Sequence, residues 1–544
     1  MRIPTLLLVL LMAQVGWKSD QKLPRPPDVS EAMVDSMAGA YYEAKLRCYP
    51  ALATRKGVPG YDGRLSTYSQ RSTFGLLARV RNAGNRLVTL DEDSLSMGKW
   101  VEYKALLADM ASQRFLLEDL EVWRSRPTIY VDACVDGIAL LCLAQIGRGQ
   151  SIDPSPRLAA VPTVIKHARR NLTDPSEFHC RVAADRLGDL IRMLENLRTR
   201  VSSAAIDSAL IDQTVVSLRS FGDFIDSLAL SASTRFTLGY DEFLLLMDTR
   251  NMISDLPEDI RAYAKGVLDR TNEELAGYES GDLVAGGHLG IEDIEDWAAR
   301  ARDFIEMKDL VSLPGKEVGS ADELGFSELP DFAAGVYKHV LYIPPAPDAP
   351  EAGRAIIYVP PEVREPGATA GGIITSEAFP GRHLQAYYSA VSPSPVRRMN
   401  TDIFAANGWA LYSQELMARE GFGGEEAIRD ALLRKRFYAA GTIAAMNILL
   451  GEFTVQAAAD FMVNETGVSE AYARELAVQY ALEPELPMSY IIGERQINRI
   501  RDEIESIQGE EFDLKGFHDS LLTSGRLPLY LLRNNLVSGS VGRR

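Results

Sequence analysis

Amphipathic helical periodicity is the feature that most limits what this chain of 544 residues can fold into. Apolar residues recur every three or four positions through residues 174–201, and this spacing places them on one face of a helix. They are Leu187, Leu190, Ile191, Leu194 and Leu197. Asp174 and Pro175 precede them, and we expect this pair to supply the helix cap and a first-turn proline.

Similar patterns predict helices at residues 98–123, 208–230, 256–278 and 290–307. No repeat of fixed period accompanies them, so the pattern favours a mainly α fold and gives no support to a solenoid. The periodicity is interrupted once, at residues 314–372, where Pro and Gly are frequent. Two short apolar runs, "HVLYIPP" and "RAIIYVPP", lie there and predict a small β-sheet or hairpin around residues 335–375.

The N-terminus has the layout of a secretory signal. One Arg precedes an apolar run from Ile3 to Trp17, and polar residues follow it. We therefore expect a signal peptide at residues 1–17 and a secreted or periplasmic protein; an uncleaved anchor is the alternative. No other segment is expected to span a membrane. The remainder is interpreted as a helical region at 18–230 and a second region at 231–544, which could together form one compact body.

Charge and cysteine content limit the partners and the cross-links. The formal net charge of −17 argues against a nucleic-acid partner, because phosphate binding needs concentrated Lys and Arg. In an exported chain, the four cysteines allow two disulfides in three connectivities, and buried free thiols are equally compatible with their apolar surroundings. These residues are Cys48, Cys134, Cys142 and Cys180.

The stretch "SEAFPGRHLQ", residues 376–385, carries the candidate site. It places Glu377 just before a Pro-Gly pair, with His383 shortly after. A catalytic zinc needs three protein ligands and an open position, and two His ligands on a regular helix must lie about one turn apart. The chain has six histidines, and no two have that spacing. A helix-borne pair of His ligands is therefore excluded, although distant histidines could still converge.

The C-terminal half resembles a bacterial family known as domain of unknown function 885, whose better-preserved members resemble zinc metallopeptidases. The family block reads His-Glu-x-x-Pro-Gly-His, and here Glu377 and the Pro-Gly pair match it. The two His positions are occupied by Ser376 and Arg382. A downstream Glu-Gly-Trp-Ala-Leu-Tyr block becomes "NGWALY", with Asn407 in place of the Glu. The resemblance therefore implies a lost metal site: zinc is expected for intact members and no cofactor for this chain.

Other motifs of the family are also partly changed and partly retained in this chain. Ala445 and Leu449 replace a family Asp and His, and Gln479 replaces the Arg of an Arg-Tyr pair. The segments at residues 486–503, 512–522 and 525–532 retain the family pattern. The resemblance covers roughly residues 230–540 and implies a large helical, zincin-like fold with a cleft, in which the small sheet lies beside the substrate groove.

Arg382, Tyr490 and Ser376 each have a possible role at the candidate site. Arg382 is expected to pair with Glu377 and to replace the metal electrostatically, because a buried carboxylate is costly unless it is paired; the alternative is that Arg382 points to solvent. Tyr490 is a remnant candidate for oxyanion stabilisation or a packed core residue. Ser376 has no nucleophile elbow or orienting acid around it, which argues against a serine hydrolase.

The remaining site candidates are binding residues. His383 is one of them, and Trp409 and Tyr412 are expected to line the former cleft or the core. His518 is expected to hydrogen-bond locally and to hold the last helices.

Together these features predict an exported pseudopeptidase that binds a peptide or protein in a remnant cleft without metal-dependent hydrolysis. The first alternative is an active hydrolase with unusual metal ligands, for example His383 with Glu377 and another acid. The second is a purely structural, envelope-associated protein.

Overall fold

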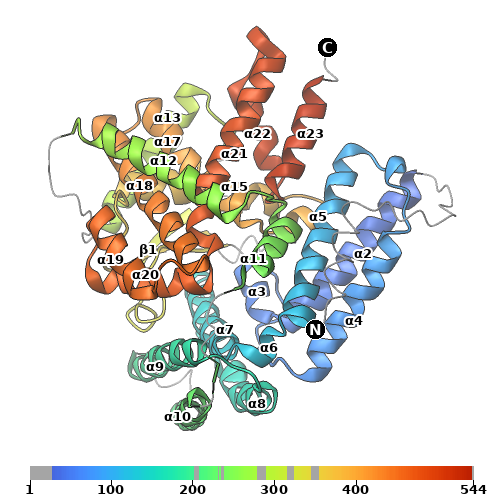
Figure 1. Ribbon diagram of the computed structural model, residues 1–544, viewed down its shortest axis with the longest axis vertical. Coiled ribbons are helices and arrows are strands. Elements are labelled where there is room, and N and C mark those ends of the chain that lie inside the picture. The colour runs from blue at the N-terminus through green and yellow to red at the C-terminus, as the bar shows by residue number, and fades with distance from the viewer. Residues whose placement is uncertain are drawn as a thin grey trace.

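The computed structural model describes residues 27–200, 207–230, 232–233, 238–278, 289–314, 324–344 and 355–541. The signal segment expected at residues 1–17 lies outside this part of the chain. The predicted mainly α fold is confirmed: a small three-stranded sheet is surrounded by helices (Figure 1). 

The N-terminal helices of the chain are α2 Pro27–Cys48, α3 Pro50–Arg55, α4 Gln70–Leu87, η1 Glu92–Ser94, α5 Met97–Arg114, η2 Phe115–Asp119 and α6 Val122–Ser125. They are followed by α7 Thr128–Gly147, α8 Ser155–Asn171, α9 Glu177–Arg200, α10 Ser208–Ala229, α11 Tyr240–Leu246, η3 Met247–Asn251, α12 Pro257–Leu275 and α13 Ile291–Lys308.

Three strands come next, β1 Leu324–Glu328, β2 Leu341–Ile343 and β3 Ala355–Val359. The remaining elements are α14 Ala370–Ile373, η5 Ile374–Ala378, α15 Arg382–Ala390, α16 Pro395–Met399, α17 Ile403–Arg419, α18 Gly424–Leu449, α19 Val455–Thr466, α20 Glu470–Leu482, α21 Glu485–Gln508, η6 Gly509–Glu511, α22 Leu514–Thr523 and α23 Leu529–Val541.

The sheet lies between two hydrophobic cores. Its strand order is β1-β3-β2, with β1 parallel and β2 antiparallel to the central strand. Ile357 and Val359 of β3 pack into a main core that includes side chains from both N- and C-terminal helices. Ile356 and Tyr358 pack into a second core with α7 to α10, where the Tyr358 hydroxyl donates to the Leu143 carbonyl at 2.9 Å. Burial on both faces explains why β3 is continuously apolar instead of alternating.

The two predicted strands at residues 339–345 and 354–361 are confirmed as β2 and β3. The third strand, β1, lies N-terminal to the segment in which a sheet was expected. We expected no segment other than the N-terminal one to be able to span a membrane, and helix α7 corrects this. Thr128–Gly147 is long and apolar enough to cross a membrane, although most of it is buried against other parts of the protein. A buried core helix satisfies the same length and composition criteria.

Several local predictions also need correction. Helix α9 begins at Glu177, and its cap is Ser176, whose hydroxyl accepts from the His179 backbone N–H at 3.2 Å; the expected Asp174-Pro175 cap is wrong by two residues. The segment 98–123 is not one helix, because α5 ends at Arg114 and Glu121 has a left-handed φ of 42°. All four cysteines are free thiols, so neither disulfide forms in this structure.

Helices α17 and α21 make a close crossing in the C-terminal region, where the candidate site lies. Gly408 and Gly493 meet at the crossing, and a Cβ on either residue would overlap backbone atoms of the other helix. The absence of side chains therefore lets the two backbones approach each other closely. This packing holds Asn407 and Tyr490, on α17 and α21, in one neighbourhood.

Candidate functional site

A sharp corner in the chain positions the candidate site. The helix that begins at α14 widens at η5, which carries Ser376 and Glu377, and the chain turns at Pro380 and Gly381 before α15. A Cβ at Gly381 would overlap the Ser376 carbonyl, so only glycine fits there without a shift. The indole N–H of Trp409 lies 2.8 Å from the Pro380 carbonyl oxygen and 3.2 Å from that of Gly381. These contacts fasten the corner to α17 and give the Pro-Gly pair a structural role.

The expected ion pair between Arg382 and Glu377 is present. The Arg382 Nε lies 3.0 Å from Glu377 Oε2 and 3.2 Å from Oε1, and Arg382 Nη2 donates to the Tyr490 hydroxyl at 2.7 Å. The Arg382 side chain is only 20% exposed, so the alternative that it points to solvent is wrong. Burial would lower the pKa of Arg382, but Glu377 raises it above the ordinary value.

A second guanidinium, Arg434 of α18, also contacts the η5 segment. Its Nη1 donates to the Ser376 hydroxyl at 2.8 Å, and its Nη2 lies 3.6 Å from Glu377 Oε1. The same Nη2 lies 3.4 Å from Glu365 Oε2. Arg434 therefore links two carboxylates that are 12 residues apart in the chain.

Glu365 is held as a carboxylate by three neighbours. The Tyr438 hydroxyl donates to it at 3.2 Å, and His339 Nδ1 lies 3.4 Å from its other oxygen. Burial alone would raise the pKa of Glu365, but His339, Arg434 and Tyr438 together lower it to about 2. The Tyr438 ring stacks on that of Tyr490 with centroids 3.5 Å apart, which closes a network between α18 and α21.

Arg526 is the third guanidinium of this neighbourhood. It donates to the Gln385 side chain and to the Arg382 carbonyl, both at 3.0 Å. Burial and the charge of Arg382 lower the pKa of Arg526 to about 10, so it is still a cation at neutral pH. The three guanidinium groups of Arg382, Arg434 and Arg526 thus outnumber the two carboxylates, Glu365 and Glu377, by one charge.

The three positions that resemble metal-ligand positions do not fit a zinc ion. Ser376 donates its hydroxyl hydrogen to the Gly372 carbonyl, Arg382 is a cation, and Asn407 Nδ2 donates to the Ser489 hydroxyl at 2.7 Å. His383 is fully buried, and its Nδ1 lies 3.2 Å from the Tyr342 hydroxyl. Across the residues that the structure describes, no group of three or more His, Cys, Asp or Glu side chains is arranged to hold a metal. Zinc sites in proteins use Cys, His and carboxylate ligands, whereas these three positions offer a hydroxyl, a guanidinium and an amide.

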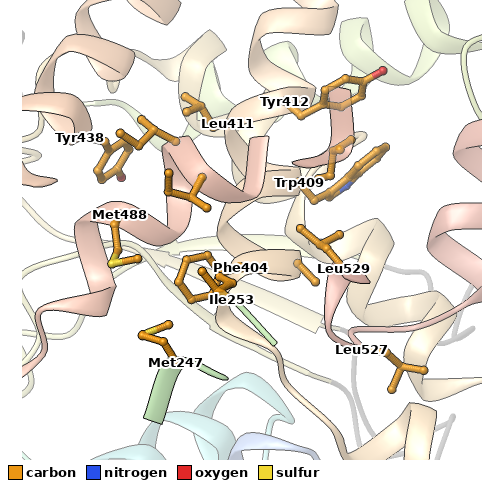
Figure 2. Close-up of a cluster of buried hydrophobic side chains, with 14 of the residues drawn as sticks. Met247, Ile253, Phe404, Trp409, Leu411, Tyr412, Tyr438, Met488, Leu527 and Leu529 are labelled. Carbon is orange, nitrogen blue, oxygen red and sulfur yellow. The ribbon is translucent and has the colours of Figure 1, made fainter. Parts of the chain in front are cut away.

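Trp409, Tyr412 and His518 are core residues. The rings of Trp409 and Tyr412, both on α17, lie in a buried cluster (Figure 2), with centroids 5.5 Å apart. The Tyr412 hydroxyl lies 2.8 Å from His518 Nε2, and His518 Nδ1 lies 2.7 Å from the Leu310 carbonyl oxygen. Trp409 and Tyr412 therefore lie in the core, which is one of the two locations expected for them. His518 does hold α22 in place, through a partner that is distant in sequence instead of local.

Two surface cavities are found near the candidate site, and Glu377 and Tyr490 line neither of them. One, of about 200 Å³, lies between α13, α14, α17 and α18. The other, of about 380 Å³, lies between α12, α17, α18 and α21 and has Lys435 in its wall. Lys435 Nζ lies 2.7 Å from Glu415 Oε1 and 3.3 Å from Glu494 Oε1, so this second cavity is internally charge-paired.

Sequence reasoning missed Glu365, Arg434 and Arg526. One usable signal was available for Arg434: it falls on the same helical face as Tyr438, Gly441 and Ala445, in a run that is otherwise core-forming. A charge at a core-facing position predicts a buried partner. Glu365 and Arg526 lie in a Pro-rich loop and after α22, where no periodicity marks their direction.

Comparison with known proteins finds a family match and solved structures of the same fold. Residues 290–536 match the family described as "Bacterial protein of unknown function (DUF885)". The resemblance expected from the motifs is thereby confirmed over these residues. A comparison with curated proteins finds no match.

Two solved structures share the fold over almost their whole lengths. A candidate lipoprotein of unknown function from Shewanella oneidensis superposes with a TM-score of 0.70 at 19% identity, covering 92% of this chain and 98% of that one. A candidate lipoprotein from Colwellia psychrerythraea superposes with a TM-score of 0.72 at 15% identity, covering 94% of this chain and 100% of that one. Identities this low establish similarity of fold.

Proposed function

We propose that this protein is a non-catalytic relative of zinc peptidases that binds a peptide or protein without hydrolysing it. The observation that carries the proposal is the position of Glu377, the residue that would act as general base. It is 7% exposed and held by Arg382, with Arg434 beside it. A general base must reach a water or a substrate proton, and a carboxylate fixed between two guanidinium groups is poorly placed to accept one.

The same arrangement supports the idea that arginine charge replaces metal charge. A dication at a peptidase site neutralises nearby carboxylates and polarises a substrate carbonyl. Arg382, Arg434 and Arg526 supply the neutralising charge here, but a guanidinium offers no open coordination position and cannot generate a metal-bound hydroxide. The network is therefore suited to holding the fold, and it supports neither the hydrolase alternative with His383 nor a role for Ser376 as a nucleophile.

Binding is proposed at the surface beside this network, which we call the Arg382 surface. It consists of the partly exposed side chains of Arg382, Tyr342 and Tyr490 together with the more exposed His339. The network beneath it carries an excess positive charge in a chain whose net charge is −17. Aromatic and arginine side chains are the residue types that most often dominate protein interfaces. These features favour an extended acidic peptide as the partner.

An envelope location is part of the proposal. It is supported by the signal-like N-terminus and by the fold shared with two candidate lipoproteins. The alternative of a purely structural envelope protein predicts no saturable peptide binding, which distinguishes it from the leading proposal.

Metal analysis and an activity assay test the non-catalytic part. Protein dialysed against zinc and then against metal-free buffer is expected to retain substoichiometric zinc and to show no chelator-sensitive cleavage of a mixed peptide library. One zinc per chain together with chelator-sensitive cleavage would refute it and would favour the hydrolase alternative.

Selection from a random displayed peptide library tests the binding part. We expect acidic peptides to be enriched and to bind the His339→Ala variant several-fold more weakly, whereas the matched His167→Ala variant on α8 binds as the wild type does. If no peptide is enriched, or if enriched peptides bind both variants equally, the Arg382 surface is not the binding site.

A further inference from the structure

The smaller cavity, between α13, α14, α17 and α18, contains buried acceptors without donors. We call it the Trp297 cavity. Gln414 is 2% exposed and Asp430 is 5% exposed, and both residues line this space. Gln414 Oε1 and Asp430 Oδ1 have no hydrogen-bond donor among the described residues of the chain. Leaving one such buried acceptor unpaired is costly, and two of them line one small cavity.

The remaining atoms of these two side chains are fixed. Asp430 Oδ2 accepts from the Thr369 hydroxyl at 2.7 Å, and Gln414 Nε2 donates to the Gly367 carbonyl at 3.4 Å. These bonds orient both side chains and assign the oxygen of the Gln414 amide as its unpaired end. The acceptors are therefore held in position before any ligand arrives, which lowers the ordering cost of binding.

The ionisable residues that line the cavity are acidic, and Arg429 acts on Asp430 from outside it. Asp430 and the exposed Glu426 are its ionisable lining residues, and no Lys, Arg or His is found among the described residues that line it. Arg300 lies 4.2 Å over the Trp297 ring but does not line the cavity. The first turn of α18 also reaches the cavity and by itself would favour an anion, but two carboxylates in the same space outweigh it. The larger cavity differs because Lys435 already pairs with its acids.

The rest of the wall is apolar and small. Trp297 and Phe422 meet edge to face with centroids 5.3 Å apart, and Gly371 and Gly423 leave the space beside the Trp297 ring open. A volume of about 200 Å³ is below the usual range of drug-sized pockets, so it suits a group of only a few carbon atoms. Aromatic walls beside a carboxylate also favour organic cations.

We propose that the Trp297 cavity binds the ammonium end of a small organic cation, either a free alkylamine or the N-terminus of a peptide. An ammonium carries three donors and no acceptor, so it matches a cavity whose lining residues carry two unpaired acceptors, Gln414 Oε1 and Asp430 Oδ1. The carbon chain then lies against Trp297 and Phe422. This proposal is independent of the Arg382 surface, because the two sites share no residue.

Isothermal titration calorimetry with n-butylamine at neutral pH tests the proposal, with n-butanol as the uncharged control of the same shape. Butylamine is expected to bind saturably and butanol at least about tenfold more weakly, as loss of a charged hydrogen bond implies. Asp430→Asn keeps the acceptor for Thr369 and should weaken butylamine at least about tenfold, whereas Glu426→Gln at the exposed rim should change it less than about threefold. Gln414→Met, which retains the side-chain length without the acceptor, is the second variant should Asp430→Asn fold poorly.

Spermidine and trialanine amide then distinguish the two sources of the ammonium group. Tighter binding of spermidine assigns a free polyamine, and tighter binding of the peptide, abolished by N-acetylation, assigns a peptide N-terminus. Either result supports an ammonium site. Absence of saturable binding by butylamine, spermidine and the peptide to folded wild-type protein overturns the proposal, and so does butylamine binding that Asp430→Asn and Gln414→Met leave unchanged.

Discussion

Replacing Arg382 with Ala tests whether the guanidinium carries the charge that Glu377 requires. Removing one partner of a buried ion pair typically costs about 3–5 kcal/mol, because the other charge is left buried and uncompensated. Two structural facts indicate that the cost of Arg382→Ala lies at or below the lower end of this range. Its side chain is 20% exposed, and Glu377 keeps Arg434 at 3.6 Å. We therefore expect the free energy of unfolding to fall by about 2–3 kcal/mol, including the lost bond to Tyr490.

The expected shift in melting temperature follows from the size of the chain. Unfolding entropy is about 2.1 cal/mol/K per residue, or about 1.1 kcal/mol/K for 544 residues, so the loss corresponds to about 2–3 °C. Urea denaturation and differential scanning calorimetry both measure it. Arg474→Ala is the matched control, because Arg474 forms an exposed pair with Glu470 on α20 and should cost less than about 0.5 kcal/mol.

A double-mutant cycle isolates the Arg382–Glu377 interaction from general damage. Glu377→Gln combined with Arg382→Ala should cost less than the two single changes added together, with a coupling of about 1–3 kcal/mol. The reasoning is refuted if Arg382→Ala melts as the wild type and the Arg474→Ala control do. Additive single effects would show that the two side chains contribute separately and that no charge replacement takes place.

Three further predictions address the scaffold. Trp409→Phe should cost about 1–3 kcal/mol by chemical denaturation, because the Pro380 carbonyl loses its buried donor; stability equal to wild type would mean that the corner does not depend on the indole. Gly493→Ala should cost about 3 kcal/mol or more by overlap at the α17–α21 crossing, while Gly75→Ala on α4, where a Cβ meets nothing within 4 Å, should stabilise by about 0.5–1 kcal/mol. Burial lowers the pKa of His518 from its ordinary 6.5 to about 4; between these values the unfolded chain binds a proton that the folded chain does not, so stability should fall as the pH decreases from 6.5 to 4. His518→Gln should flatten part of this decrease in denaturation midpoints measured across that range, and an unchanged pH profile would contradict the assignment.

Local signals in the sequence were enough for the fold class and for part of the site. Helical periodicity predicted α9, α10, α12 and α13 close to their observed bounds, and the two apolar runs predicted β2 and β3. The Arg382–Glu377 pair was predictable because its members are five residues apart, on either side of a turn. Strand β1 was missed because its partner β3 lies beyond another strand in the chain. Pairing between segments that are not neighbours in sequence gives no recognisable pattern in the sequence of either strand.

The rest of the site depends on contacts that span long distances in sequence. Arg434 is 58 residues from Ser376, and Arg526 is 144 residues from Arg382. The sequence alone placed Trp409 on a candidate cleft or in the core, and only the three-dimensional packing shows its indole bonded to a corner 29 residues upstream. The Trp297 cavity was not predicted either, because its acceptors lie on two helices and become a pair only after α17 and α18 pack together.

The arrangement of charges explains how two carboxylates can lie close together inside this scaffold. Glu365 and Glu377 lie in a region from which water is largely excluded, and each would be strongly destabilising if left alone. Arg434 neutralises both from one position, Arg382 adds a second bond to Glu377, and Arg526 fastens the backbone that carries Arg382. Removal of Arg434 takes a cation from both carboxylates, leaving Glu365 with His339 and Tyr438 and Glu377 with Arg382, whereas removal of Arg382 affects only Glu377. Arg434→Met should therefore be more damaging than Arg382→Ala, and the reverse order would show that Arg382 is the main counter-charge of the network.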